Sequence, residues 1–188
     1  MAKKKFEVER VIDTAISIFW KHGYAATSIQ MIVNETGLKP GSIYHEFGSK
    51  EGLFRLALSQ YAQQSIENGS RIILESENVL EGIKKLLKGL VESSGTTDYC
   101  GCFLIKSQLE LASQNDAIYV NAVESLKKIE TNYISHLGQI YPTKTATLYA
   151  SQLMMVIFGL RIYGYQKGAQ QKITTTIESL LPWLYESN

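Results

Sequence analysis

Apolar residues recur at helical spacing along most of the 188-residue chain, and no convincing strand pattern accompanies them. The clearest stripes lie in residues 8–19, 79–91 and 120–137, where aliphatic or aromatic side chains stand three or four positions apart. Such spacing places the apolar side chains on one face of each helix, which then packs against the rest of the fold. The pattern predicts an all-α protein of about nine helices.

One predicted helix, which Pro142 opens, is apolar on every side in its middle. Its segment Leu153–Leu160 reads LMMVIFGL and is far shorter than the ~20 residues that span a bilayer. We therefore predict no membrane contact. A helix that is apolar all round has to be covered all round. The chain itself provides one cover and a second subunit the other, so we predict a homodimer through the last two helices.

The stretch Thr27–Lys50 predicts two short helices joined by a tight turn, followed by the start of a third helix. Thr27 is the expected N-cap, with Gln30 three residues on as in a capping box. Gly37 suits a left-handed residue at the end of the first helix. Pro40 suits the first turn of the second helix, where its missing N–H has no partner.

The residue pattern of the second helix indicates a surface that can enter a groove of DNA. Ile43 and Phe47 are four residues apart and share the inner face, whereas Gly41, Ser42 and His45 point outward. Tyr44 lies on the flank. A short helix with an apolar inner face and a small, polar outer face is suited to the DNA major groove.

Composition adds a modest charge asymmetry to this picture. The chain carries 19 Lys and Arg against 18 Asp and Glu, for a net charge of +1. Residues 1–55 hold eight basic and six acidic residues, which gives them a net charge of +2 and leaves −1 for the remainder. This distribution fits a nucleic-acid-binding N-terminus on a neutral body.

Motifs for catalysis or metal binding were not found. The sequence has no HExxH, glycine-rich phosphate loop, C-x-x-C or nucleophile elbow, and its three histidines are scattered. We expect no enzyme activity, no cofactor and no metal. The N-terminus lacks the apolar run of a signal peptide, and two cysteines are too few for a disulfide framework, so we expect a cytoplasmic protein.

The two cysteines, Cys100 and Cys102, allow two interpretations. They stand at the entry to a predicted helix, where the helix dipole favours a thiolate and hence a reactive-thiol sensor. The alternative is two small, half-buried side chains with no reactivity. A C-x-C pair is too small a set to hold zinc.

The run GSIYHEFGSKEGLF at Gly41–Phe54 carries a family resemblance. Together with the preceding helix pair it resembles the DNA-binding motif of the TetR/AcrR-like (tetracycline-repressor-like) transcriptional regulators. The matching positions are Thr27, Ile32, Gly37, Gly41, Tyr44, His45, Phe47, Ser49, Lys50 and Glu51. The resemblance implies a helix-turn-helix domain at residues 1–55 and an effector-binding and dimerisation domain at residues 56–188. It also implies a repressor that a small molecule releases from a palindromic double-stranded DNA operator.

The predicted DNA contacts divide by role. The positive end of the helix beginning at Thr27 faces a phosphate, and Tyr44, His45 and Lys50 contact the backbone. Lys39, Gly41 and Ser42 are the candidates for base edges. The full predicted set is Thr27, Ser28, Lys39, Pro40, Gly41, Ser42, Tyr44, His45 and Lys50.

The resemblance also implies a pocket for the effector in the body, with the helix at Lys50–Asn68 as the part that moves. The candidate lining is Tyr99, Cys102, Phe103, Tyr119, Tyr133, Met154, Phe158, Arg161 and Tyr163. Met155 is a further candidate, and so is His136, although a surface or capped position is expected for His136. Aromatic and Met residues at helical spacing are also typical of an ordinary core. The alternatives to a ligand-released repressor are a thiol-sensing repressor, a DNA-binding protein without effector, and an all-helical enzyme.

Overall fold

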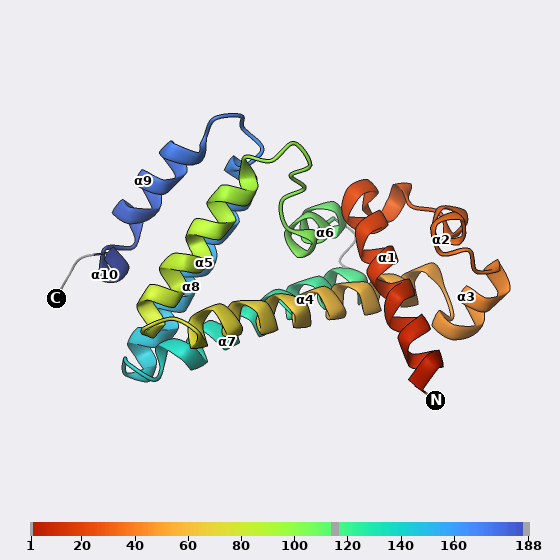
Figure 1. Ribbon diagram of the computed structural model, residues 1–188, viewed down its shortest axis with the longest axis horizontal. Coiled ribbons are helices and arrows are strands. Elements are labelled where there is room, and N and C mark those ends of the chain that lie inside the picture. The colour runs from red at the N-terminus through yellow and green to blue at the C-terminus, as the bar shows by residue number, and fades with distance from the viewer. Residues whose placement is uncertain (1, 114–116, 186–188) are drawn as a thin grey trace. The chain divides into compact units, whose positions relative to one another are not determined.

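The computed structural model describes residues 2–113 and 117–185, with side chains from residue 8 onward. This part of the chain contains ten helices and no strand, which confirms the all-α prediction (Figure 1). The helices are α1 (Ala2–Ala26), α2 (Ile29–Thr36), α3 (Pro40–Phe47), α4 (Lys50–Leu74), α5 (Val79–Ser94), α6 (Phe103–Leu111), α7 (Ala117–Leu137), α8 (Thr143–Tyr163), α9 (Gln170–Leu180) and α10 (Pro182–Tyr185). The helix beyond the expected nine is α10, a four-residue helix that starts at Pro182.

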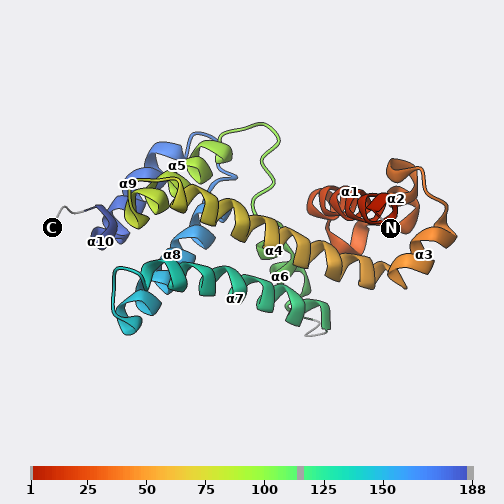
Figure 2. The same cartoon turned by 60° about the horizontal axis from the view of Figure 1, so that its bottom comes forward.

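Backbone contacts divide the chain into two compact units. Unit 1 comprises Met1–Gln64 and Cys102–Leu126, and unit 2 comprises Ser65–Gly101 and Lys127–Asn188. The boundary falls within α4 and α7, and the two helices are the long gold and teal ones of Figure 2. The predicted division of function after residue 55 is a different boundary and stays a prediction.

Unit 1 is built around an aromatic core. The predicted stripe of α1 is buried, and Phe19 meets Phe54 edge to face with ring centroids 4.7 Å apart. Phe54 in turn contacts Phe103 of α6 at 5.6 Å, and Phe103 contacts Tyr61 at 5.6 Å. Pairs with this geometry add about 0.5–1.5 kcal/mol beyond the burial of their area. The core therefore joins α1, α4 and α6 directly beneath the predicted DNA-binding helices.

In unit 2 the helices α5, α8 and α9 each pack against the other two, and α5 lies in front of α8 in Figure 1. Apolar side chains of the three helices fill the space between them, among them Leu87, Leu153 and Ile177. Gly82 of α5 lies against α4, where an added Cβ would come 2.6 Å from the Ile73 Cα. The backbones of α4 and α5 therefore approach closely here, since glycine has no Cβ to hold them apart.

The helix α8 extends well beyond its eight-residue apolar centre. Within the described residues it is the one helix whose length and hydropathy, 21 residues and a mean of 1.3, meet the criteria for crossing a membrane. The buried helix of a water-soluble protein meets the same criteria. Seven residues of α8 are buried within this chain. The expected absence of membrane contact stays a prediction.

Candidate nucleic-acid interface

The helix α2 begins one residue later than predicted. Ser28 is the N-cap, with φ −101° and ψ 156°, and its Oγ accepts a hydrogen bond of 3.2 Å from the Met31 N–H. At the other end Gly37 adopts φ 69°, and its N–H donates to the Val33 carbonyl at 2.9 Å. The prediction of a left-handed Gly37 is confirmed. The N-cap prediction is wrong because a second hydroxyl residue follows Thr27 and takes that position.

Thr27 has a structural role instead. Its side chain is 1% exposed, and its Oγ1 donates to the Gly23 carbonyl at 2.6 Å. The Thr27 hydroxyl is bonded to the backbone in this structure, and the predicted DNA contact of Thr27 stays a prediction. Ser28 is exposed at the helix N-terminus, which is the position that was predicted for Thr27.

The helix α3 has the two faces that the sequence indicated. Ile43 and Phe47 are 1% and 8% exposed, and Pro40 occupies the first turn. Tyr44 is 50% exposed. The other predicted contacts of this segment, Lys39, Pro40, Gly41, Ser42 and His45, are also exposed. The inner side chains anchor α3 to the fold, and the outer ones remain available to a partner.

Lys50 has different partners from those predicted. Its Nζ donates to the Tyr24 carbonyl at 2.9 Å and to the Thr27 carbonyl at 3.0 Å. The same atom lies 4.3 Å from the centroid of the Tyr24 ring. Two of its three N–H donors therefore hold the backbone between α1 and α2. A phosphate contact for Lys50 has only the remaining donor to use.

Sequence reasoning missed two charged side chains that hold the same segment. Glu110 of α6 accepts hydrogen bonds from the N–H groups of Tyr24 and Ala25, at 3.0 and 2.8 Å. Lys106, one turn earlier in α6, donates to the Trp20 carbonyl at 2.6 Å. The partners are about 85 positions apart in sequence. The local pattern therefore contained no signal for them.

The predicted effector residues are distributed over both units. Cys102, Phe103 and Tyr119 belong to unit 1, and the others belong to unit 2. Phe103 is 1% exposed between the Phe54 and Tyr61 rings, so it is a core residue of unit 1. The Cys102 thiol is buried and lies 3.9 Å from the Tyr61 hydroxyl.

In unit 2 the remaining candidates differ in their exposure and in their hydrogen bonds. Tyr133 and Met154 are buried, and Phe158 is half-buried. The Tyr99 hydroxyl donates to the Arg161 carbonyl at 3.1 Å, and the Arg161 Nη1 donates to the Gly101 carbonyl at 3.4 Å. Effector contacts by all of these residues stay predictions.

Another candidate, His136, is buried rather than at the surface. Its side chain is 8% exposed, and its Nε2 lies 3.1 Å from the Ser70 Oγ. The Ser70 hydroxyl donates to the Asn132 Oδ1 at 3.1 Å, which leaves the Nε2 of His136 as the donor to Ser70. Burial lowers the pKa of His136 below its ordinary value, and the neutral imidazole is therefore favoured.

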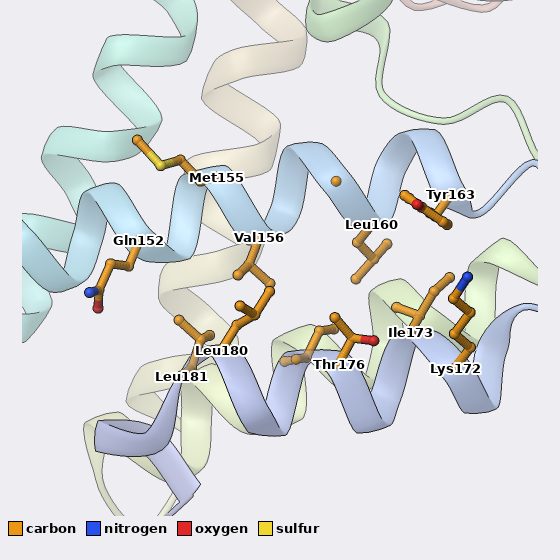
Figure 3. Close-up of a pocket in the computed structure, with 12 residues that line it drawn as sticks. Gln152, Met155, Val156, Leu160, Tyr163, Lys172, Ile173, Thr176, Leu180 and Leu181 are labelled. Atoms are coloured by element: carbon orange, nitrogen blue, oxygen red, sulfur yellow. The ribbon is translucent and has the colours of Figure 1, made fainter.

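A groove of about 460 Å³ lies between α8 and α9 in unit 2. Figure 3 shows Val156 and Leu160 pointing from α8 toward α9, where Ile173 and Leu181 face them. Its lining residues are Gln152, Met155, Val156, Gly159, Leu160, Tyr163, Lys172, Ile173, Thr176, Ile177, Leu180 and Leu181. Met155 and Tyr163 are the predicted effector residues in this lining.

An exposed apolar stripe borders this groove along α8. Leu148, Met155 and Ile162 are seven residues apart and 55%, 74% and 49% exposed. Gly159 lies in the same stripe, and an added Cβ there would meet nothing within 4 Å. The helix predicted to be apolar on every side thus has one face covered within unit 2 and another left open.

Comparison with known proteins identifies the N-terminal part. Residues 11–57, which include α2, α3 and the start of α4, match the model of the bacterial regulatory proteins of the tetR family. Over 179 residues the chain is 27% identical to the HTH-type transcriptional repressor ComR of Escherichia coli (strain K12), covering 90% of this chain and 85% of that protein. Residues 11–57 therefore carry the N-terminal domain of the tetR family.

Solved structures of TetR-family regulators share the fold of the whole chain. CifR, as a cysteine mutant complexed with a 26-base-pair double-strand operator DNA, superposes with a TM-score of 0.70 at 24% identity. That match covers 92% of this chain and 94% of CifR. A TetR regulator from Chloroflexus aurantiacus superposes with a TM-score of 0.80 at 20% identity, over 100% and 98% of the two chains.

Proposed function

We propose that this chain binds a palindromic DNA operator as a homodimer and represses transcription until a small molecule releases it. The observation that carries the proposal is the exposed outer face of α3, in a domain that matches the family model. The relative ComR is named as a transcriptional repressor, and the neighbour CifR as a complex with operator DNA. A regulator of a bacterial chromosome acts in the cytoplasm.

The size and chemistry of α3 suit the DNA major groove. As an α-helix it is about 10–12 Å across with its side chains, which matches a groove about 12 Å wide. Gly41 has no side chain to hold the backbone away from the bases, and Lys39 is placed to donate to the O6 and N7 atoms of guanine. Tyr44, His45 and Ser28 donate to phosphates, which sets the register of the protein on the duplex without reading sequence.

Dimerisation follows from how little DNA one such helix covers. Two-fold dimers read two half-sites whose centres are about 34–36 Å apart, or a multiple of that distance. We propose α8 and α9 as the contact between subunits, since the open stripe at Leu148, Met155 and Ile162 borders the groove between them. The two helices are the last long ones of the chain, followed by the short α10.

Release by an effector requires a ligand that prefers the conformation unsuited to DNA. A coupling of about 1–3 kcal/mol between the two sites is typical of such regulation. We keep the unit 2 residues Tyr99, Phe158 and Arg161 as candidate contacts. The alternative is a thiol sensor at Cys100 and Cys102, for which Cys102 has less support because its sulfur is buried against Tyr61, whereas Cys100 is half-buried.

The test is a selection of binding sites from random duplex DNA, followed by affinity measurements on the selected duplex. We expect a two-fold symmetric consensus. Tyr44→Ala should weaken binding by about tenfold or more without changing the oligomeric state. Tyr165→Ala is the matched control, since its side chain is 51% exposed and lies outside α1–α3. A monomer that shows no preference among duplexes would overturn the proposal.

A further inference from the structure

The backbone that joins α1 to α2 has a break at Gly23. This residue has φ 82° and ψ 173°, a combination that is essentially restricted to glycine. The next residues make a single helical turn before Ser28 caps α2. Residues 23–28, which we call the joining turn, therefore set the direction in which α2 leaves α1.

Glu110 binds the amide end of the joining turn. Its two carboxylate oxygens accept one hydrogen bond each, from the N–H groups of Tyr24 and Ala25. A carboxylate at free backbone N–H groups is the favourable arrangement for the start of a helical turn. An added Cβ at Gly23 would lie 2.8 Å from the Glu110 Oε2, so the glycine also makes room for this contact.

Lys50 binds the carbonyl end of the same turn, through the oxygens of Tyr24 and Thr27. Lys106 binds the Trp20 carbonyl just before the break at Gly23. Three charged side chains from α4 and α6 thus hold the backbone on both sides of the break. All of these groups lie in unit 1.

Among the described residues, Lys106 and Glu110 form hydrogen bonds to the backbone of α1 and not to each other. The two residues are four apart in α6, a spacing at which opposite charges commonly pair on a helix surface. In the described structure they form no such ion pair, and each bonds to the backbone of α1. α6 lies beside α1, consistent with these bonds (Figure 1). A rotation or shift of α6 would therefore act on the joining turn directly.

We propose that Lys106 and Glu110 are positioning residues through which α6 sets the orientation of α2 and α3, and so the affinity for DNA. This inference rests on the proposed function, since it takes operator binding by α3 as its output. Functional groups have to be held within about 0.5 Å of their productive geometry. A joining turn that is free to rotate moves the α3 outer face by more than this, because α3 lies beyond the turn.

The first measurement is hydrogen exchange at individual backbone amides, without DNA. Glu110→Gln keeps the size of the side chain but removes its charge and one acceptor. We expect faster exchange at Tyr24 and Ala25 in this variant and unchanged exchange at both amides in the control Glu124→Gln, an exposed glutamate of α7. Unchanged exchange in Glu110→Gln would overturn the clamp itself.

The second measurement is the affinity for the duplex selected from random DNA, with the oligomeric state followed by sedimentation. We expect Glu110→Gln and Lys106→Met each to bind about tenfold more weakly with the oligomeric state unchanged. Faster amide exchange with unchanged affinity would overturn the proposal, because the clamp would then be structural alone. Absence of specific binding by the wild-type chain would refute the proposed function instead, and the exchange experiment distinguishes the two failures.

Discussion

Two glycines of α5 allow a test of how closely this helix approaches α4. Gly82 and Gly89 are seven residues apart in the same helix, and an alanine at either position gains helix propensity. Their surroundings differ, because an added Cβ at Gly82 would lie 2.6 Å from the Ile73 Cα. At Gly89 it would meet nothing within 4 Å.

The expected magnitudes follow from these surroundings. Replacing an interior helical glycine with alanine stabilises a helix by about 1 kcal/mol, and this gain is common to both variants. The Gly82→Ala methyl group meets backbone, which cannot move aside as a side chain can. The helices have to separate, at an overpacking cost of about 1–3 kcal/mol. We expect Gly89→Ala to raise the free energy of unfolding by about 1 kcal/mol. The free energy of unfolding of Gly82→Ala should be lower than that of Gly89→Ala by the overpacking cost, about 1–3 kcal/mol.

Urea unfolding followed by circular dichroism measures both variants. The protein concentration has to be the same throughout, since the stability of a dimer depends on it. Thermal unfolding offers a second readout, in which 1 kcal/mol shifts the midpoint by about 2–4 °C for a chain of this size. Equal stabilisation by the two substitutions would refute the close approach of α5 to Ile73.

Three further predictions concern charge, pH and assembly. Lys50→Met should lower the free energy of unfolding by about 1–3 kcal/mol, since it removes hydrogen bonds from a charged group to two backbone carbonyls, and should leave the salt dependence of DNA binding unchanged. A salt slope shallower by about 0.9 would instead indicate a phosphate contact. The pKa of His136 is lower in the folded chain than its ordinary value of 6.5, so the imidazole takes up a proton in the unfolded chain first as the pH falls. The free energy of unfolding should therefore decrease as the pH drops below 6.5. The variant His136→Gln should lack this part of the pH dependence in urea titrations. Met155→Glu should give monomers in sedimentation, whereas Leu74→Glu, at a residue 71% exposed on α4, should not.

The helix α3, which we propose reads DNA, could be predicted well because its determinants are local. Pro40, Ile43 and Phe47 lie within eight residues, and their spacing alone defines the start and the inner face of α3. The start of α2 was misplaced by one residue because Thr27 and Ser28 are both good caps. The choice between them depends on the burial of Thr27 and on its bond to the Gly23 carbonyl, which the sequence does not reveal.

The determinants that escaped prediction are long-range or depend on packing. Lys50 and Glu110 each bind backbone atoms of residues far away in sequence, and no periodic pattern encodes such pairs. Phe103 stands at helical spacing, which indicates that it is buried but cannot distinguish a core from a cavity. The rings of Phe54 and Tyr61, both in α4, pack against Phe103 and show that it lies in a core.

The anchoring of α3 by Ile43 and Phe47 has an evolutionary consequence. Its packing residues and its solvent-facing residues are separate sets, and the clamp on the joining turn lies outside α3 altogether. Substitutions at Gly41, Ser42 or His45 can therefore accumulate without a penalty in folding. Related proteins with this fold can therefore acquire different outer residues on α3 while the position of the helix in the fold stays the same.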